Sequence, residues 1–446
     1  MADTNATTTT DKQQPEELND AWIRDKLIPK LIDDGKIFEK HQVQVLAVNV
    51  KPVSLDGFML SAPSKVEIEF SYVDDGDKCE GGKSRHAVSD KLCLVVKKTP
   101  AVPKEVYVVC QFEFLFENEL IAYTEIIPLL SQAKKYPKFY YSERKELSAV
   151  CVLEDFSLYG WRSAKQLYNL PLQHILMAVR EVATFHGEMY ALKVSNLRAF
   201  NKIAAQLKEA RIANGNIHPE YNLKLVTCRE RLVKAVKMYE KDKVPETFLE
   251  MFLEYTKNPY TMFKRQFEPI EPLAIICHGD YLRNNIAFKF DENDLPTDVM
   301  MYDFQTMRYA SPMLDLTTLL IVSAFHDVRA KNFDEIFSLY HTTLLDAFCA
   351  KEKIQNRNEV PSYLSKDSLL KDYARHLPNS IIIAASFLPL LITPIEANSV
   401  FELRQLTTEE VIKDTMERGG ALLDRELAHM MLEFYQLCNK FEIEFN

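Results

Sequence analysis

The chain has 446 residues, of which 47% are hydrophobic and 26% are charged, as in a globular protein with a substantial core. Its formal net charge is -10 at pH 7. Because the phosphate backbone of a nucleic acid attracts a basic face, we expect no nucleic-acid partner. No basic run stands out in the sequence, so we also expect no anionic membrane surface as a partner.

The N-terminal segment, Met1 to Gln14, is polar and Thr-rich and lacks the apolar core of a secretory signal. We expect residues 1–16 to form a disordered tail. The eight Cys residues are scattered without a Cys-x-x-Cys pair, which favours reduced thiols. Both observations predict a cytoplasmic location, while the oligomeric state is left open.

A first helix is expected over Glu17–Asp34, and a β-rich part follows it. Gln42–Val50 is apolar and β-branched, and Lys65–Tyr72 alternates strictly between apolar and polar residues, which is typical of a half-buried antiparallel strand. Pro63 is expected to interrupt this second strand at its start, which indicates a bulge or an edge. Leu92–Val96 predicts a third strand, and Lys97 lies at its end.

The next segment, Phe112–Pro128, has helical periodicity and contains Glu119. Two further strands are expected over Phe139–Tyr141 and Ala149–Leu153, and they lead into Glu154-Asp155-Phe156. Helical periodicity dominates from Leu172 onwards, except between residues 273 and 304.

This order of elements predicts an α+β, protein-kinase-like fold with two lobes. An antiparallel sheet with one main helix would form an N-terminal nucleotide-binding lobe over residues 17–155. A mostly helical lobe over residues 156–446 would hold the catalytic and substrate-binding residues.

The most informative motif is His278-Gly279-Asp280, with Asn285 five positions after the Asp, followed by Asp303-Phe304-Gln305. An Asp, an Asn and a second Asp in this order hold a nucleotide and its magnesium ions in kinases. Phosphoryl transfer requires positioning and charge neutralisation more than covalent chemistry. We therefore assign Asp280 the orientation and deprotonation of the acceptor hydroxyl.

The segment between Asn285 and Asp303 predicts a hairpin. Ile286–Phe290 and Val299–Tyr302 have the pattern of strands, and the Asp-rich stretch between them has that of a turn. Such a hairpin brings Asn285 and Asp303 side by side at its open end. These two residues are the expected Mg²⁺ ligands.

In this frame Lys97 is expected to contact the α- and β-phosphates of ATP, and Glu119 to hold Lys97 by an ion pair. Both also fit ordinary surface residues, since Lys98 follows Lys97 directly and Glu119 has other acidic neighbours. Glu154, Asp155 and Phe156 complete the expected nucleotide-binding residues.

Structural roles are expected for three further residues. His278 is predicted to brace the loop by hydrogen bonds, Asp315 to accept backbone hydrogen bonds from the catalytic loop, and His186 to pack in the core or to cap a helix. Arg308 has no predicted role beyond pairing with a nearby carboxylate.

These motifs resemble those of the ecdysteroid kinase-like family, also called CHK kinase-like, which is similar in fold to aminoglycoside and choline kinases. The matching segments are Leu94 to Pro100, Phe116 to Glu119, Val152 to Asp155, Phe185-His186, Cys277 to Asn285 and Asp303 to Leu316. The resemblance implies ATP-dependent phosphorylation of a hydroxyl on a small molecule, either a steroid or a xenobiotic.

The sequence departs from the family pattern in two places. Leu282 stands where the family usually has Trp, and the loop Asp56–Ser61 has a shifted Gly and carries Phe58 where the family has Asn. Because glycine allows backbone amides to approach phosphates closely, this loop favours weaker nucleotide binding. A pseudokinase that binds a ligand or a partner is therefore the alternative function.

Protein substrates are not expected, because Asp315 lies only twelve positions after Asp303 and no Ala-Pro-Glu motif follows. The acceptor itself is left open between two chemistries. Apolar residues that would suit a steroid are Phe387, Leu388, Leu390, Leu391, Ile392 and Phe401, each of which also fits a helix of the lobe core. Acidic residues that would suit a cationic alcohol are Glu396, Glu409 and Glu410.

Overall fold

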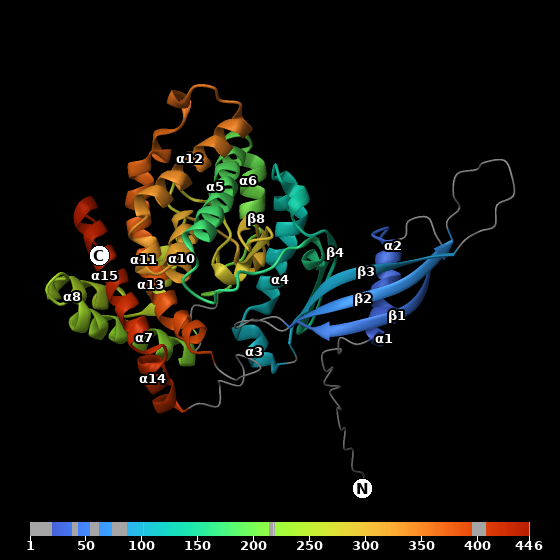
Figure 1. Cartoon of the computed structure of the whole chain (residues 1–446), viewed down its shortest axis with the longest axis horizontal. Helices are drawn as coiled ribbons and strands as arrows, with labels where there is room; N and C mark the ends of the chain where they lie inside the picture. The colour runs from blue at the N-terminus through green and yellow to red at the C-terminus, as the bar shows by residue number, and fades with distance from the viewer. Residues whose placement is uncertain are drawn as a thin grey trace, which may run out of the picture. The chain divides into compact units, whose positions relative to one another are not determined.

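A computed structural model describes residues 20–37, 43–53, 62–73, 87–100, 102–213, 217, 219–394 and 407–445 (Figure 1). It combines an antiparallel five-stranded sheet with many helices, which confirms the predicted α+β, two-lobed, kinase-like fold class. The described residues form two compact units. The first lies within Met1–Val53, Leu60–Val108 and Lys138–Asp155, and the second within Ser54–Met59, Val109–Pro137 and Phe156–Asn446.

The first unit is built on a sheet with the strand order β1-β2-β3-β5-β4, all neighbours being antiparallel. Its strands are β1 (Val43–Pro52), β2 (Ala62–Val73), β3 (Ala87–Lys98), β4 (Phe139–Lys145) and β5 (Ser148–Glu154). The predicted inward face of β2 is confirmed, because Val66, Ile68 and Phe70 are buried.

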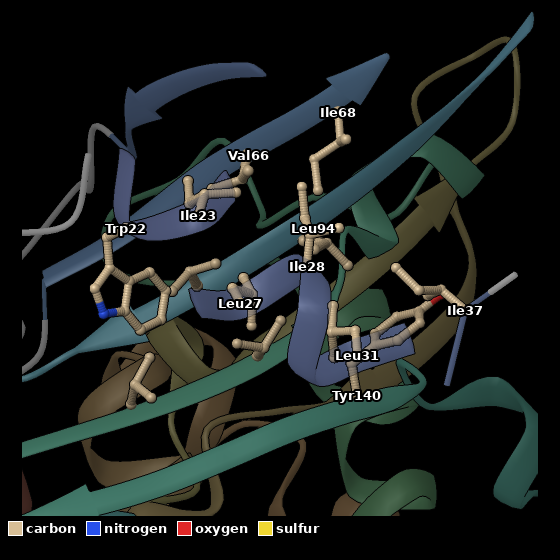
Figure 2. Close-up of a cluster of buried hydrophobic side chains, with 13 residues drawn as sticks. Trp22, Ile23, Leu27, Ile28, Leu31, Ile37, Val66, Ile68, Leu94 and Tyr140 are labelled. Carbon is tan, nitrogen blue, oxygen red and sulfur yellow. The ribbon is translucent and has the colours of Figure 1, made fainter. Parts of the chain in front are cut away.

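An N-terminal helical segment covers one face of this sheet. It consists of α1 (Asp20–Trp22), η1 (Ile23–Leu27) and α2 (Ile28–Asp33), and it ends at Gly35, which has the left-handed φ of a helix terminus. Figure 2 shows Leu27 and Leu31 of this segment turned toward Leu94 on β3. Burying one such side chain contributes about 2 kcal/mol, so the segment is held by hydrophobic contact with the sheet.

Pro63 does not interrupt β2, contrary to the sequence prediction. The strand continues through it, with Pro63 opposite Lys97 of β3, while its carbonyl accepts a hydrogen bond from the N–H of Val53. The irregularity in this part of the sheet lies instead in β1, between Val45 and Ala47. The glycine-poor loop Asp56–Ser61 lies outside the described residues.

The second unit is mostly helical. Its longer helices are α4 (Phe112–Ile121), α5 (Leu172–Ser195), α6 (Leu197–Ala204), α7 (Pro219–Tyr239), α8 (Glu246–Tyr255), α9 (Pro259–Phe267), α10 (Met313–Ser323), α12 (Phe333–Glu352), α13 (Lys366–Ile392), α14 (Thr408–Glu417) and α15 (Gly420–Phe441). Shorter helical segments of this unit are η2 (Ala122–Ile126), η3 (Ile127–Leu129), η4 (Ala133–Lys135), η5 (Phe156–Tyr159), α11 (His326–Arg329), η8 (Arg357–Glu359) and η9 (Ser362–Leu364). Helix α3 (Lys104–Val109) belongs to the first unit except for its last residue.

Two small antiparallel sheets lie among these helices, and the motif residues lie at the ends of their strands. One pairs β6 (Ile275–Cys277) with β9 (Arg308–Ala310), and the other pairs β7 (Ile286–Phe290) with β8 (Pro296–Met301). The segments η6 (Arg283–Asn285) and η7 (Phe304–Thr306) connect them to the rest of the motif. Helix α5 packs along α12, as Figure 1 shows, and α10 packs along α13.

Helix α13 is long and apolar enough to cross a membrane by length and composition, but 83% of its most apolar window is buried inside the protein. Its C-terminal part, Ile381–Ile392, is a continuous stretch of mostly apolar residues, and a more polar N-terminal part that includes Asp372 precedes it. The hydroxyl of Ser380 contacts those of Thr317 and Thr318 on α10. The burial of the helix is that of a core helix.

The C-terminal helix α15 is anchored by Glu433, whose carboxylate accepts hydrogen bonds from Arg329 at 2.8 Å and contacts His326 at 2.9 Å. The Arg329 side chain is completely buried. Burial opposes the ionisation of Glu433, but the charge of Arg329 and the hydrogen bonds from His326 and Arg329 outweigh it and lower the pKa to about 2.

We expect Glu433→Gln to lower the free energy of unfolding at pH 7 by about 3 kcal/mol, because the substitution leaves the buried Arg329 without a counter-charge. The pKa of Glu433 is depressed in the folded protein, so its contribution is complete above the ordinary value of 4.5 and is lost as the pH falls toward 2. Urea denaturation at pH 7 and pH 3 measures this, with the exposed Glu417→Gln as control. A difference between wild type and Glu433→Gln that stayed constant over this range would contradict the prediction.

Candidate catalytic loop

The loop after β6 is organised by Asp315, which is 1% exposed. Its carboxylate accepts hydrogen bonds from the backbone N–H groups of His278 at 2.7 Å and Gly279 at 2.8 Å, and from Nε2 of His186 at 3.1 Å. Burial alone would raise the pKa of Asp315, but the hydrogen bonds from His186 and Gly279 help to hold it below its ordinary value. The predicted bracing role of Asp315 is confirmed.

His186 and Cys277 lie beside Asp315, and all three are buried side chains of a type that binds metals. The Nδ1 atom of His186 accepts a hydrogen bond from the hydroxyl of Tyr340 at 2.8 Å, so both ring nitrogens are already engaged. The cluster is thus a hydrogen-bonded part of the core, as predicted for His186.

His278 is fully buried and joins the catalytic loop to the end of β8. Its Nδ1 accepts from the N–H of Asp280 at 3.4 Å, while its Nε2 donates to the carbonyl of Tyr302 at 3.0 Å. The two contacts together require the tautomer with the proton on Nε2. His278 therefore has the predicted bracing role.

Gly279 can have no side chain for two reasons. Its φ is +85°, and a Cβ atom at this position would lie 1.9 Å from the carbonyl oxygen of Thr306. The close approach of the loop to η7 excludes the Arg that protein kinases have here.

Asp280 and Asn285 contact each other within the loop. The Nδ2 atom of Asn285 donates to the backbone carbonyl of Asp280 at 2.7 Å and to its Oδ2 at 3.2 Å. Because the amide nitrogen is engaged by Asp280, Oδ1 is the Asn285 atom suited to bind a cation.

The predicted hairpin is present, with Ile286 opposite Met301. Tyr302 rather than Asp303 lies opposite Asn285, and its N–H donates to the Asn285 carbonyl at 3.0 Å. Pairing of Asn285 with Asp303 would require a turn centred on Asp294, whereas Phe290 lies opposite Pro296, and the register shift between Lys289 and Phe290 recovers only one of the two residues of offset. Asp303 follows directly with a φ of +67°, a conformation that non-glycine residues rarely adopt and that is concentrated at functional sites.

Helix α4 is attached to this loop region through two fully buried residues. The Oε2 atom of Glu119 accepts a hydrogen bond from Nε2 of Gln305 at 3.3 Å, and Nδ2 of Asn118 donates to the carbonyl of Gln305 at 3.0 Å. Gln305, which stands where protein kinases have Gly, thus links Glu119 to the segment that follows Asp303.

Lys97 lies in the first unit, on β3, and is 5% exposed. Lys98 points toward the indole ring of Trp22 in the N-terminal helix, with Nζ 5.4 Å from the ring centroid. Since successive side chains of a strand point to opposite faces, Lys97 faces away from that helix. Lys97 and Lys98 therefore lie on opposite faces of the sheet, while the phosphate contact of Lys97 stays a prediction.

Glu154 and Asp155 end the first unit, and both carboxylates have partners there. Glu154 accepts a hydrogen bond from the N–H of Lys138 at 3.2 Å, and Asp155 forms an ion pair with Lys65 at 3.0 Å. Phe156 begins η5 in the second unit, with its ring 5.3 Å from that of Tyr302. Nucleotide binding by these three residues also stays a prediction.

The residues suggested for binding the acceptor do not lie in one place. Leu388 and Leu391 are buried in the core, and Glu410 caps α14 through Thr407. Phe401 and Glu396 lie outside the described residues.

Sequence reasoning missed the cation beside the candidate base. Nη2 of Arg211 lies 2.5 Å from Oδ1 of Asp280. Arg308, which had no assigned role, forms an ion pair with Glu209 at 3.0 Å. The segment containing Glu209 and Arg211 lies 69 residues before Asp280 and matches no motif, so only the fold reveals the contact.

The antiparallel sheet of the first unit and the mostly helical second unit agree with a two-lobed, kinase-like fold. The sequence model of the ecdysteroid kinase-like family matches residues 61–352, and the chain belongs to this family. Membership indicates a kinase-like phosphotransferase that acts on small molecules. No curated protein matches the chain.

We expect Gly279→Ala to destabilise the fold by roughly 2 kcal/mol more than Gly160→Ala, as measured by urea denaturation. Gly160 is the matched control, because it has a similar φ of +82° but a methyl group on its Cα would meet no atom within 4 Å. Both substitutions carry the cost of the left-handed backbone, so the difference between their free energies of unfolding measures the clash with Thr306 alone. Equal destabilisation by the two substitutions would show that the loop can move away from η7 without cost.

Proposed function

We propose that the protein is an ATP-dependent kinase that transfers the γ-phosphoryl group to a hydroxyl of a small molecule, either a steroid of the ecdysteroid type or a xenobiotic. The observation that carries the proposal is the contact between Asp280 and Asn285 at the open end of the hairpin that leads to Asp303. We place this activity in the cytoplasm.

Asp280 is the proposed general base. It orients the acceptor hydroxyl and takes its proton as the oxygen attacks the γ-phosphorus. Its loop is held on one side by Asp315 and on the other by His278, so the carboxylate is positioned before the acceptor binds. Such preorganisation is the main contribution that a protein makes to phosphoryl transfer.

Asn285 and Asp303 are the proposed Mg²⁺ ligands. An amide oxygen and a carboxylate are the hard oxygen donors that this ion prefers, and the hydrogen bonds from Nδ2 of Asn285 orient its Oδ1 for this task. Magnesium, when bound, neutralises the charge that develops on the phosphates.

Lys97 is the proposed partner of the α- and β-phosphates, and Glu119 is the proposed carboxylate that positions it. Glu119 is fully buried and tied to Gln305, which links it to the segment after Asp303. Glu154, Asp155 and Phe156 are the proposed binding segment for the rest of the nucleotide.

The proposed binding of MgATP is tested by thermal unfolding. We expect millimolar MgATP to raise the midpoint by several degrees, because a ligand of the folded state alone stabilises it. Asp303→Asn should lose most of this shift, whereas substitution of the exposed Asp242→Asn should retain it. Absence of any shift in the wild-type protein would reject the kinase.

Catalysis is tested by mass spectrometry of hydroxylated steroids and xenobiotics incubated with MgATP. We expect a phosphate ester with the wild-type protein and at least a roughly hundredfold slower reaction with Asp280→Asn, because the base is lost. Product formed at an unchanged rate by Asp280→Asn would refute its role. Nucleotide binding without any product would favour the pseudokinase alternative.

A further inference from the structure

Arg211 lies against the proposed base, with its Nη2 2.5 Å from Oδ1 of Asp280. The side chain of Arg211 is 24% exposed and that of Asp280 is 28% exposed, so solvent reaches this pair. Burial lowers the pKa of Arg211, but the negative charge of Asp280 more than compensates and the pKa is raised. A permanent cation is thus present beside Asp280.

The segment that carries Arg211 is held by Asn118 of α4. The amide of Asn118 donates from Nδ2 to the carbonyl of Lys208 at 2.8 Å and accepts at Oδ1 from the N–H of Lys208 at 2.9 Å. Asn118 is fully buried, and the same Nδ2 donates to the carbonyl of Gln305. One side chain therefore fixes the segment to the loop that follows Asp303.

Glu209 supplies a second attachment. Its carboxylate forms an ion pair with Arg308 at 3.0 Å and accepts from the N–H of Arg211 at 2.8 Å. Arg308 is 5% exposed and stacks over Phe267, with its guanidinium carbon 3.9 Å from the ring centroid. Burial lowers the pKa of Arg308, the charge of Glu209 opposing this effect. Arg211 is therefore presented to Asp280 by a braced backbone.

We propose that Arg211 is a further catalytic residue, whose guanidinium contacts the phosphoryl group during its transfer. The inference rests on the proposed kinase function. An acceptor hydroxyl oriented by Asp280 attacks phosphorus a few ångströms from that carboxylate, which is within reach of Arg211. A planar guanidinium matches phosphoryl oxygens with two parallel N–H groups, and an arginine at this position stabilises the charge of the transition state.

The reaction balances without a covalent role for Arg211. The acceptor oxygen forms a bond to the γ-phosphorus, while the bond from that phosphorus to the bridging oxygen breaks and its electron pair stays with ADP. The acceptor proton passes to Asp280. Arg211 donates hydrogen bonds to the transferring oxygens, and so exchanges part of its contact with Asp280 for them.

A blocking contact is the opposite interpretation, in which Arg211 closes off the base and must leave before the acceptor binds. The two interpretations predict opposite effects of Arg211 on the affinity for the transferring phosphoryl group. A catalytic Arg211 increases the affinity for the transferring phosphoryl group, whereas a blocking one decreases it.

The test uses the full-length protein, MgADP and aluminium fluoride, which together mimic a phosphoryl group in transfer. We expect MgADP to stabilise wild type and Arg211→Ala equally in thermal unfolding. Aluminium fluoride should add a further shift in wild type, and Arg211→Ala should bind the MgADP–aluminium fluoride complex on the order of a hundredfold more weakly. The surface substitution Arg198→Ala is the matched control and should behave as wild type.

Arg211→Lys keeps the charge and serves if the alanine variant does not fold. We expect it to bind the MgADP–aluminium fluoride complex about tenfold more weakly than wild type, because an ammonium lacks the two parallel N–H groups. Retention of the full additional shift by either variant, or its increase, overturns the proposal. Loss of the MgADP shift in the variants alone marks Arg211 as structural and also overturns it. Absence of the MgADP shift in wild type rejects the kinase function itself, and the role of Arg211 with it.

Discussion

The conformation of the catalytic loop depends on the hydrogen bonds that the carboxylate of Asp315 accepts. This carboxylate is almost completely buried, yet it stays charged, because two backbone N–H groups and a histidine donate to it. Transferring such a carboxylate from water to the core is costly, and only a full set of donors makes it tolerable. The loop has to adopt one conformation for those donors to converge. That conformation in turn presents Asp280.

In the same region, two close contacts involve positions at which this chain and protein kinases have different residues. Gly279 lets the loop approach the carbonyl of Thr306, and Gln305 uses its side chain to reach Glu119 on α4. An Arg and a Gly, the residues of protein kinases at these two positions, would break both contacts. Asp315 follows Asp303 after only twelve positions, which is too short for the long activation segment of a protein kinase.

Asn118 and Glu209 attach a segment without any recognisable motif to the catalytic loop region. Both anchor the backbone between Lys208 and Arg211, and together they place a guanidinium beside Asp280. Family membership indicates a kinase-like phosphotransferase of small molecules. The ion pair at Asp280 adds a cation that the motifs themselves do not contain.

Much of this could be read from the sequence because it is local. Strict alternation over Lys65–Tyr72 predicted which face of β2 is buried. The strand and turn patterns between Asn285 and Asp303 predicted the hairpin that connects them. Tertiary structure alone decided that Lys98 rather than Lys97 faces Trp22, that Tyr302 rather than Asp303 pairs with Asn285, and that Arg211 meets Asp280. The physical reason is that periodicity and spacing encode backbone conformation over a few residues. Contacts between segments 69 residues apart depend instead on how buried groups such as Asn118 satisfy their hydrogen bonds, which no local pattern records.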